Sequence, residues 1–333
     1  MSQPLGTAGL YAEFVEKDSV RHSDSEGAVA VGGDATFGDA KQSSGFSIGH
    51  KLTGADLAEL PGGHSLVVGG TLHANQVVLD NGTGVAGRVV GGVDGDKVEE
   101  GASPVDFTKE FAHLRKLSAG WAATEPGGTV AAVGDGLFLT GTDEKLNVFA
   151  VNAVDLEKAR AITLDVPVGS STLVNVLGTS YDMSTSATYG VYYKNLDGGA
   201  PVIDDYAVPR DEYRQIRSRL LWNFPQAESV KKNHTSWPGT ILAPNAEVEM
   251  GGKGTGPGHV NGSVVAEELV TVPGAETHRM NFTGCLPGGT TPGPVVTPET
   301  PQPTDTPVPV PPATPAPTPS EGGSTPGTSG TPS

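Results

Sequence analysis

Two side chains near the end of the chain have types and a spacing that could do chemistry. Glu276 and His278 are two residues apart, so they share one face if this segment is a β-strand. A histidine beside a carboxylate can act as a general base, or it can lock a terminal coil through a hydrogen bond. The neighbouring sequence offers neither a nucleophile nor a metal partner, so the pattern favours the structural role.

A second group of acidic residues could bind a cation. Asp94 and Asp96 flank a glycine, and Glu99 and Glu100 follow closely, so carboxylate oxygens could gather on one loop as calcium requires. The spacing of a complete calcium loop is missing. We therefore interpret this segment as a solvated acidic loop, with calcium at Asp94 and Asp96 as the alternative.

Several patterns that usually indicate metal, phosphate or thiol chemistry are missing. The sequence has no His-x-x-His, no His-Glu-x-x-His and no phosphate loop. Cys285 is its one cysteine, which excludes Cys-x-x-Cys and any intrachain disulfide. We expect no catalytic residues, no cofactor and no metal beyond the calcium alternative, and hence a protein that is not an enzyme.

Charge and hydropathy restrict the partners. The formal net charge is -17 at pH 7, whereas a binder of nucleic acid or of an anionic membrane needs a basic surface. A membrane span or the core of a signal peptide needs a long apolar run, and the chain has none. We expect no nucleic acid partner and no membrane insertion by this segment, with signal peptide and anchor absent from it.

Composition and repeats predict a mainly β fold. With 47 glycines and 27 prolines, the chain favours turns over helices. Residues 241–243 (Ile-Leu-Ala) align on residues 264–266 (Val-Val-Ala) with a period of 23, and such periods are typical of stacked coils. Val-Gly-Gly begins at Val31, Val68 and Val90, the last two 22 residues apart. Each copy is a candidate coil of a right-handed, irregular β-solenoid.

One long helix is predicted in the first half of the chain. Ser103 is a candidate N-cap and Pro104 a candidate first helical residue. Apolar side chains then recur on one helical face, and this stripe consists of Phe107, Phe111, Leu114, Leu117 and Trp121. We predict a helix from about Pro104 to Thr124 that lies lengthwise on the solenoid.

Shorter elements are predicted elsewhere. A helix from Asp211 to Arg219 would present a solvated basic face made of Arg210, Arg214, Arg217 and Arg219. Short strands bounded by Gly, Asp or Pro are predicted at Leu137–Thr140, Val148–Asn152, Ile162–Val166 and Thr172–Val176.

The segment Leu-Leu-Trp-Asn-Phe-Pro at 220–225 is the most distinctive block. Alternation along a strand would turn Trp222 and Phe224 into the solenoid interior. Asn223 would then face the other way, where it could join a hydrogen-bonded corner or point outwards.

Several segments occur in the order found in a known family of bacterial surface domains. They are residues 24–33, 66–70, 220–225, 239–244 and 276–278. Over about residues 5 to 284, the sequence resembles the choice-of-anchor A domain. The late part also resembles, more weakly, the discontinuous β-solenoid ice-binding domains, which carry a long helix beside the solenoid. The motif residues, expected to be structural, are Asp24, Gly27, Gly32, Gly33, Trp222, Asn223, Phe224, Pro225, Gly239, Ala243, Pro244, Glu276 and His278.

The resemblance implies a cell-surface protein. We expect a non-enzymatic adhesin, extracellular and anchored to the cell wall or surface, that binds a matrix protein, a glycan or a neighbouring cell. Ice binding is the alternative function, although no Thr-x-Thr array repeats in successive coils. A polysaccharide-acting enzyme on a β-helix is a further alternative, but no cluster of acidic and basic residues aligns with the period.

Composition changes sharply after residue 284. The segment 285–333 is rich in Pro, Thr, Gly and Ser, and it holds 15 of the 27 prolines. Such a segment cannot bury enough apolar surface to offset the entropy of ordering it. We therefore expect a β-solenoid domain over residues 1–284 and a disordered, Pro-rich stalk over 285–333.

Overall fold

A parallel β-solenoid is the main feature of the computed structural model, which describes residues 4–38, 46–93, 97–194, 196, 198–252 and 258–288. Each coil contributes strands to ladders on different sides of a common apolar core. We call these sides the helix face, the open face and the third face. The mainly β prediction is confirmed, and the helices are few.

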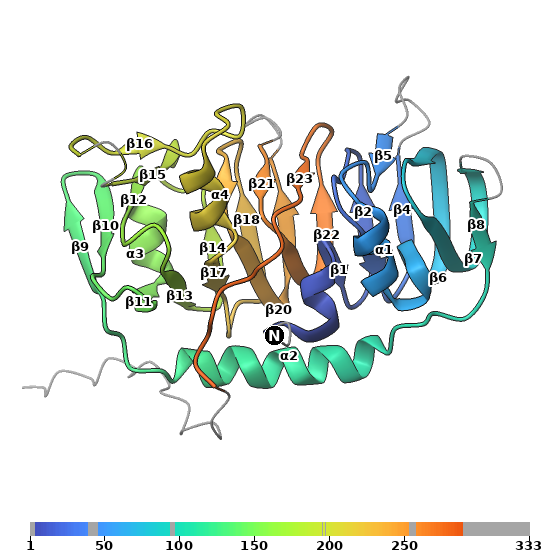
Figure 1. The fold of residues 1–333 in the computed structure, drawn as a ribbon, viewed down its shortest axis with the longest axis horizontal. Coiled ribbons are helices and arrows are strands. Elements are labelled where there is room, and N and C mark those ends of the chain that lie inside the picture. Colours follow the sequence, from blue (N-terminus) through green and yellow to red (C-terminus); the bar gives the residue numbers. More distant parts are fainter. Residues whose placement is uncertain are drawn as a thin grey trace, which may run out of the picture. The chain divides into compact units, whose positions relative to one another are not determined.

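The helix face is a continuous parallel ladder that carries the long helix α2 (Figure 1). In spatial order its strands are β11 (Leu146–Asn152), β13 (Ser171–Leu177), β17 (Leu220–Asn223), β20 (Thr240–Met250), β22 (Val264–Thr271), β1 (Glu13–Val15), β3 (Val29–Val31), β6 (His64–Leu79), β7 (Thr83–Val93) and β8 (Val98–Glu100).

The order of these strands in space differs from their order in the chain. The chain enters in the middle of the ladder at β1 and builds outward to β8 at one end. It then passes along α2 and builds inward from β11 at the other end until β22 pairs with β1 (Figure 1). The solenoid is therefore discontinuous: its two halves meet where Phe14 pairs with Val265.

The open face is a second parallel ladder formed where the chain turns after the helix face. Its eight strands are β14 (Ser180–Asp182), β18 (Ser229–Lys232), the later parts of β20 and β22, β2 (Ser19–Arg21), β4 (Ala35–Phe37), and the middle parts of β6 and β7. Seven strand spacings of about 4.8 Å give this ladder a length of about 34 Å.

The third face closes the coils. Its strands are β19 (Trp237–Pro238), β21 (Val260–Asn261), β23 (Thr277–His278), β5 (Phe46–Ile48) and the end of β6, with Ser25 bridging β23 to β5. Beside it lies a sheet of β9 (Thr129–Val133), β10 (Gly136–Thr140), β12 (Ala161–Asp165), β15 (Gly190–Tyr193) and β16 (Val202–Ile203). The strands predicted from the sequence are confirmed as β10, β11, β12 and β13.

The 23-residue repeat is confirmed by the strand register. Ile241 pairs with Val264, and Ala243 pairs with Ala266. The upstream repeat is only partly correct. Val31 pairs with Val68 as predicted, but Val90 pairs with His73 and not with Val68. The shared Gly-Gly dipeptide is not a guide to strand pairing, because the register of a strand is set by its buried apolar residues.

Glycines allow successive coils to touch at one corner. A Cβ at Gly69 would lie 2.2 Å from the carbonyl oxygen of Gly32, and a Cβ at Gly32 would lie 2.1 Å from that of Glu16. No side chain fits between backbones this close. The corner therefore requires glycine in adjacent coils.

We expect Gly69→Ala to destabilise the protein by about 1–3 kcal/mol, because the added methyl group forces the two coils apart. Urea denaturation measures this cost. Gly127→Ala is the matched control, since a Cβ at Gly127 meets no atom within 4 Å. Equal stabilities for the two variants would show that the corner tolerates a side chain.

The long helix α2 spans Phe107–Ala122 and lies on the helix face. Its predicted apolar stripe is buried except for Leu117, which is half-buried. The predicted start was wrong: Asp106 is the N-cap and accepts a hydrogen bond from the Lys109 amide at 3.0 Å. The Ser103 hydroxyl instead accepts from the Val105 amide, in a turn before the helix.

The remaining helices are short. They are α1 (Gly54–Glu59), α3 (Ala153–Lys158) and α4 (Asp211–Arg217), with 3-10 turns at η1 (Gly6–Leu10) and η2 (Pro61–Gly63). Among the described residues, no helix has the length and hydropathy needed to cross a bilayer.

The apolar core has two parts. One fills the solenoid interior, where Trp222 packs on Trp237 with ring centroids 4.7 Å apart. The other lies between the helix face and α2, where Phe14 stacks on Phe107 and Phe111 at 5.2 and 5.6 Å. Helix α2 thus completes a hydrophobic layer that the solenoid alone would expose.

Candidate functional site

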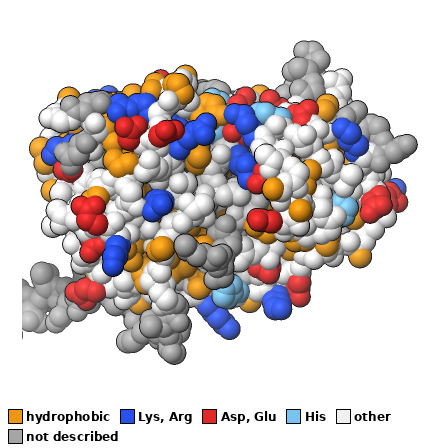
Figure 2. Space-filling view, viewed as in Figure 1, with side chains coloured by type: hydrophobic (Ala, Val, Ile, Leu, Met, Phe, Trp, Pro, Cys, Tyr) orange, Lys and Arg blue, Asp and Glu red, His pale blue; other side chains and the backbone are white. Residues whose placement is uncertain are grey.

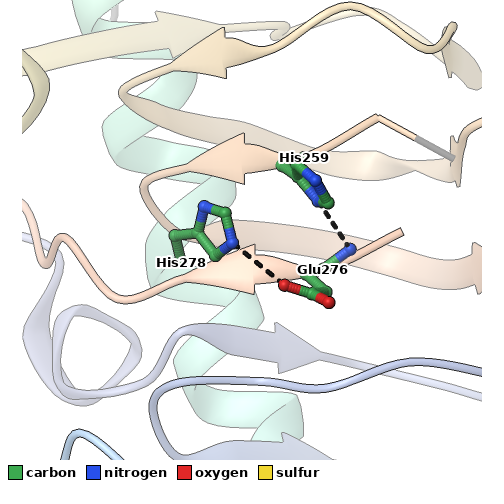
Figure 3. Close-up of side chains that lie close together, drawn as sticks. All are labelled: His259, Glu276 and His278. Atoms are coloured by element: carbon green, nitrogen blue, oxygen red, sulfur yellow. Dashed lines mark hydrogen bonds and ion pairs between the residues drawn. The ribbon is translucent and has the colours of Figure 1, made fainter. Parts of the chain in front are cut away.

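Parallel pairing on the third face brings three potential ligand side chains together. Strands β21 and β23 pair with Val260 opposite Thr277 and Asn261 opposite His278. His259 therefore lies beside Glu276, and both reach the same side as His278 (Figure 3). The three open onto a pocket of about 360 Å³, which is also lined by Asp204, Asp205, Tyr206, Ala207 and Ser236.

Hydrogen bonds fix the orientation of the His278 ring. Asn261 Nδ2 donates to Asp204 Oδ2 at 2.6 Å and to Ser236 Oγ at 2.8 Å, so both amide hydrogens are used. Asn261 Oδ1 therefore faces His278 Nδ1 at 2.8 Å and accepts its proton. The other ring nitrogen, Nε2, points at Glu276 Oε2, 3.1 Å away.

Burial and ring packing set the chemistry of the two histidines. The ring of Tyr206 stacks on His278 with centroids 3.6 Å apart, and the ring of His259 lies 4.7 Å from that of His278. Burial lowers the pKa of His278, opposed by the hydrogen bond to Glu276. Burial, followed by the nearby His278, lowers the pKa of His259. Both effects favour neutral imidazole, the form that binds metals.

A buried ion pair between Arg217 and Asp204 contributes to the wall of the pocket. Arg217 Nε donates to Asp204 Oδ1 at 2.7 Å, and the Tyr193 hydroxyl donates to the same oxygen at 2.7 Å. Arg217 is buried, so the prediction that it belongs to a solvated basic face was wrong. A carboxylate with this many donors holds Asn261, and through it His278, in a single arrangement.

The three side chains are a possible metal site. One ligand atom from each of His259, Glu276 and His278 lies within 4.8 Å of the other two. Two imidazoles and a carboxylate are a donor set that zinc accepts. Their strand backbones are paired in the solenoid ladder, which gives the set a rigid support.

Sequence reasoning found Glu276 and His278 but missed His259. His259 is 17 residues before Glu276, whereas the recognised period was 23, so no repeat placed them side by side. Trp237-Pro238-Gly239 and Val260-Asn261-Gly262 match at the 23-residue period, and Trp237 pairs with Val260. The next coil is shorter, because Val260 pairs with Thr277 after 17 residues, so the period gave no signal for this contact.

The Trp-Asn-Phe block lies where the helix face meets α2. Trp222 and Phe224 are buried in the solenoid interior, and Trp222 Nε1 donates to the Pro238 carbonyl at 2.8 Å. Asn223 points to the helix, where Nδ2 donates to the Ser118 carbonyl and to Asn175 Oδ1, both at 2.9 Å. The asparagine thus attaches α2 to the ladder.

The remaining motif residues lie at corners and in tight packing. Asp24 Oδ1 accepts from the Ser47 amide at 2.6 Å, which ties the first coil to β5. The backbone of Gly239 has φ +88°, and the Pro225 carbonyl accepts from Asn245 Nδ2 at 3.0 Å. The others pack closely against neighbouring atoms or are buried: Gly27, Gly32, Gly33, Ala243 and Pro244.

The sequence also contains a pattern that resembles the nucleophile motif of hydrolases. Residues 45–49 read Gly-Phe-Ser-Ile-Gly, which matches the Gly-x-Ser-x-Gly sequence of hydrolase nucleophile elbows. An elbow needs a sharp turn from strand to helix. Ser47 instead lies inside the extended strand β5, paired with Val78 of β6, so the pattern is coincidental.

Two other candidate regions do not add to this site. Asp94 and Asp96, the possible calcium ligands, lie outside the described residues. A second pocket of about 320 Å³ adjoins Tyr206 and is lined by several basic side chains, including Lys51, Arg214 and Arg279. Blue side chains gather in this region of the surface in Figure 2, although Glu26 and Asp56 pair with Lys51 and Arg279.

Comparison with solved structures finds matches that include three ice-binding proteins of low sequence identity. One from the Antarctic ascomycete Antarctomyces psychrotrophicus has 14% identity and a TM-score of 0.38, and the match covers 85% of this chain and 100% of that chain. One from an Antarctic biological consortium has 13% and 0.34, covering 83% and 90%. The DUF3494 domain of Shewanella frigidimarina ice-binding protein 1 has 13% and 0.32, covering 85% and 99%.

These likenesses are too weak to indicate a function. No curated protein matches the sequence. A family model does match, over residues 4–279, and its description reads "Putative Ice-binding-like adhesive domain". That range includes nearly the whole described solenoid and the three side chains of the third-face pocket. The chain therefore belongs to this ice-binding-like adhesive family.

Proposed function

We propose that this protein is a non-enzymatic, extracellular adhesion module that contacts its ligand through the open face. The main support for this proposal is a row of outward-facing side chains that stays in register across all eight strands of this face. The row consists of Asp182, Lys231, Glu249, Val270, Val20, Thr36, His73 and Val90.

The composition of this row favours a macromolecular ligand. Its first three members are charged, Val270 and Val20 form an apolar middle, and the other end consists of Thr36, His73 and Val90. Thr36, His73 and Val90 lie on adjacent strands and are exposed, Val90 to 40%. A mixed patch with an apolar centre is typical of protein and glycan interfaces.

Ice is the second candidate, favoured by the description of the family. An ice-binding surface built as a threonine array would need threonine in successive coils. The described row contains one threonine, Thr36, between Val20 and His73. This irregular composition makes ice the less favoured ligand.

The more specific features of the proposal concern display. We propose that the domain is of the choice-of-anchor A type and that the segment from residue 285 is its Pro-rich stalk. Leu286 packs on the layer under α2, and Trp121 Nε1 donates to the Pro287 carbonyl at 3.0 Å. The proposed stalk is therefore attached to the domain as far as Pro287, and residues 289–333 lie outside the described residues.

The test changes the charge of the open face without changing the core. We expect the triple variant T36E/H73E/V90E to lose attachment by at least about 30-fold, which corresponds to about 2 kcal/mol, the size of one hot-spot residue. Attachment is measured with beads coated with the full chain on matrix proteins, glycans and bacterial cells, and ice shaping is measured in parallel.

A second triple variant is the matched control. V130E/V133E/I203E also places three glutamates at exposed apolar positions, and these lie on β9 and β16, which belong to a different sheet from the open face. It should attach within about twofold of the unmodified chain, since surface changes outside an interface are nearly neutral. Equal losses in both triples would remove the open face from the proposal. Ice shaping without attachment to any other surface would replace adhesion with ice binding.

A further inference from the structure

We propose that His259, Glu276 and His278 form a zinc-type metal site with one coordination position open to solvent. The proposal is independent of adhesion, because it concerns the third face and not the open face. It depends on three observations: the fixed ring orientation of His278, the close approach of Glu276, and a third potential ligand on the same side.

The first observation is that Asn261 engages His278 Nδ1, which leaves Nε2 as the ring nitrogen that faces Glu276. The amide group of Asn261 is in turn held by Asp204 and Ser236. Metal-binding histidines commonly donate their other ring N–H to a protein acceptor, which fixes the ring and makes the free nitrogen a better ligand. His278 has this arrangement, and its ring is held further by Tyr206.

The second observation is the short distance between two potential ligand atoms. His278 Nε2 and Glu276 Oε2 are 3.1 Å apart. Ligands that bind a tetrahedral zinc ion at about 2.0–2.1 Å are separated from one another by about 3.3–3.4 Å. The pair is therefore already close to the spacing that a shared metal ion would impose.

The third observation distinguishes a metal ion from a proton. A proton shared between His278 and Glu276 needs no third partner. His259 nevertheless offers a ring nitrogen on the same side, with all three ligand atoms within 4.8 Å. Its Nδ1 is 3.4 Å from the Glu276 amide, a long hydrogen bond that a metal bond could replace. Ligand atoms of tetrahedral zinc lie about 3.4 Å apart, so a shift of up to about 1.4 Å in the His259 ring would complete a three-ligand site.

The surroundings leave room for a fourth ligand. Glu276 is 36% exposed, His259 is half-buried, and the pocket opens to solvent. Water or a carboxylate of a bound partner could occupy the open position. Two nitrogen donors and one oxygen donor favour zinc and similar transition metals over calcium, which prefers oxygen ligands alone.

The experiment is a zinc titration of the full chain after treatment with a chelator. We expect one Zn²⁺ per chain, a rise in melting temperature with zinc concentration, no competition by Ca²⁺, and a tetrahedral visible spectrum with Co²⁺. Loss of a residue that only supports a metal ligand weakens metal binding by about 10- to 100-fold. We expect a larger loss of zinc affinity from each of three variants: His259→Ala, Glu276→Gln and His278→Ala.

His113→Ala is the matched control, since His113 is exposed on α2 and far from the pocket; its zinc affinity should be unchanged. Circular dichroism in chelator shows which variants fold. His259→Ala is the decisive variant, because the His259 ring makes one long hydrogen bond and a contact with the His278 ring, whereas His278 is held by Asn261, Glu276 and Tyr206. Unchanged affinity in a folded His259→Ala variant would overturn the proposal. So would ¹⁵N NMR spectra in which added zinc shifts the signals of neither the His259 nor the His278 ring.

Discussion

Replacing Phe111 with alanine should destabilise the protein by about 3–5 kcal/mol, the range measured for large buried aromatic side chains. Phe111 is fully buried between α2 and the helix face, and its ring stacks on Phe14 at an interplanar angle of 10°. Because Phe14 lies in β1, where the two solenoid halves meet, the cavity would open at the junction itself. Urea denaturation followed by circular dichroism measures the loss.

Lys116→Ala is the control for this variant, because Lys116 lies on the exposed side of the same helix. It should change stability by no more than about 0.5 kcal/mol. A cost below about 1 kcal/mol for Phe111→Ala would mean that α2 is not held by its aromatic face.

Replacing Arg21 with methionine should also cost about 3–5 kcal/mol, because it leaves a buried carboxylate without its partner. Arg21 and Glu13 are both fully buried, and Arg21 Nε donates to Glu13 Oε2 at 2.8 Å. Glu13 also accepts a hydrogen bond from the Thr277 hydroxyl, so the carboxylate connects the first strand of the chain to the last.

The double variant Glu13→Leu with Arg21→Met separates the cost of a broken pair from the value of the pair itself. Replacing a whole buried ion pair by apolar side chains is often neutral or stabilising, so the double variant should recover most of the loss. A residual cost of about 1–3 kcal/mol is expected from the Thr277 hydroxyl, which loses its acceptor. Losses that simply add in the double variant would contradict this account.

The sequence predicted local features better than long-range order. The apolar stripe of α2 and the register of Ile241 on Val264 were predictable, because helical spacing and a repeated motif are both local signals. The pairing of Val90 was not, since the upstream coils differ in length and a shared dipeptide is a poor guide to register. The order in which coils stack depends on contacts between distant residues, which periodicity does not encode.

The candidate site shows the same division. Glu276 and His278 share a strand face, which alternation alone predicts. His259 joins them through the pairing of β21 with β23, and Asp204 and Tyr206 arrive from a loop more than 50 residues earlier. Buried polar networks such as Asp204 with Arg217 depend on the packing of separate elements, so their charged members look like surface residues in the sequence.

The meeting of β1 with β22 has a consequence for folding. In an ordinary solenoid, each repeat contacts its neighbours in the chain, so structure can grow from any point. Here β1 pairs with β22, which is about 250 residues away in the sequence, so this pairing has a very high contact order. We therefore expect the N-terminal half, which is synthesised first, to have an unpaired edge at β1 until the chain is nearly complete. An unpaired strand edge can form hydrogen bonds with another molecule. Exchange of halves between two chains, giving a dimer with the same coils, is the characteristic misfolding hazard of this topology.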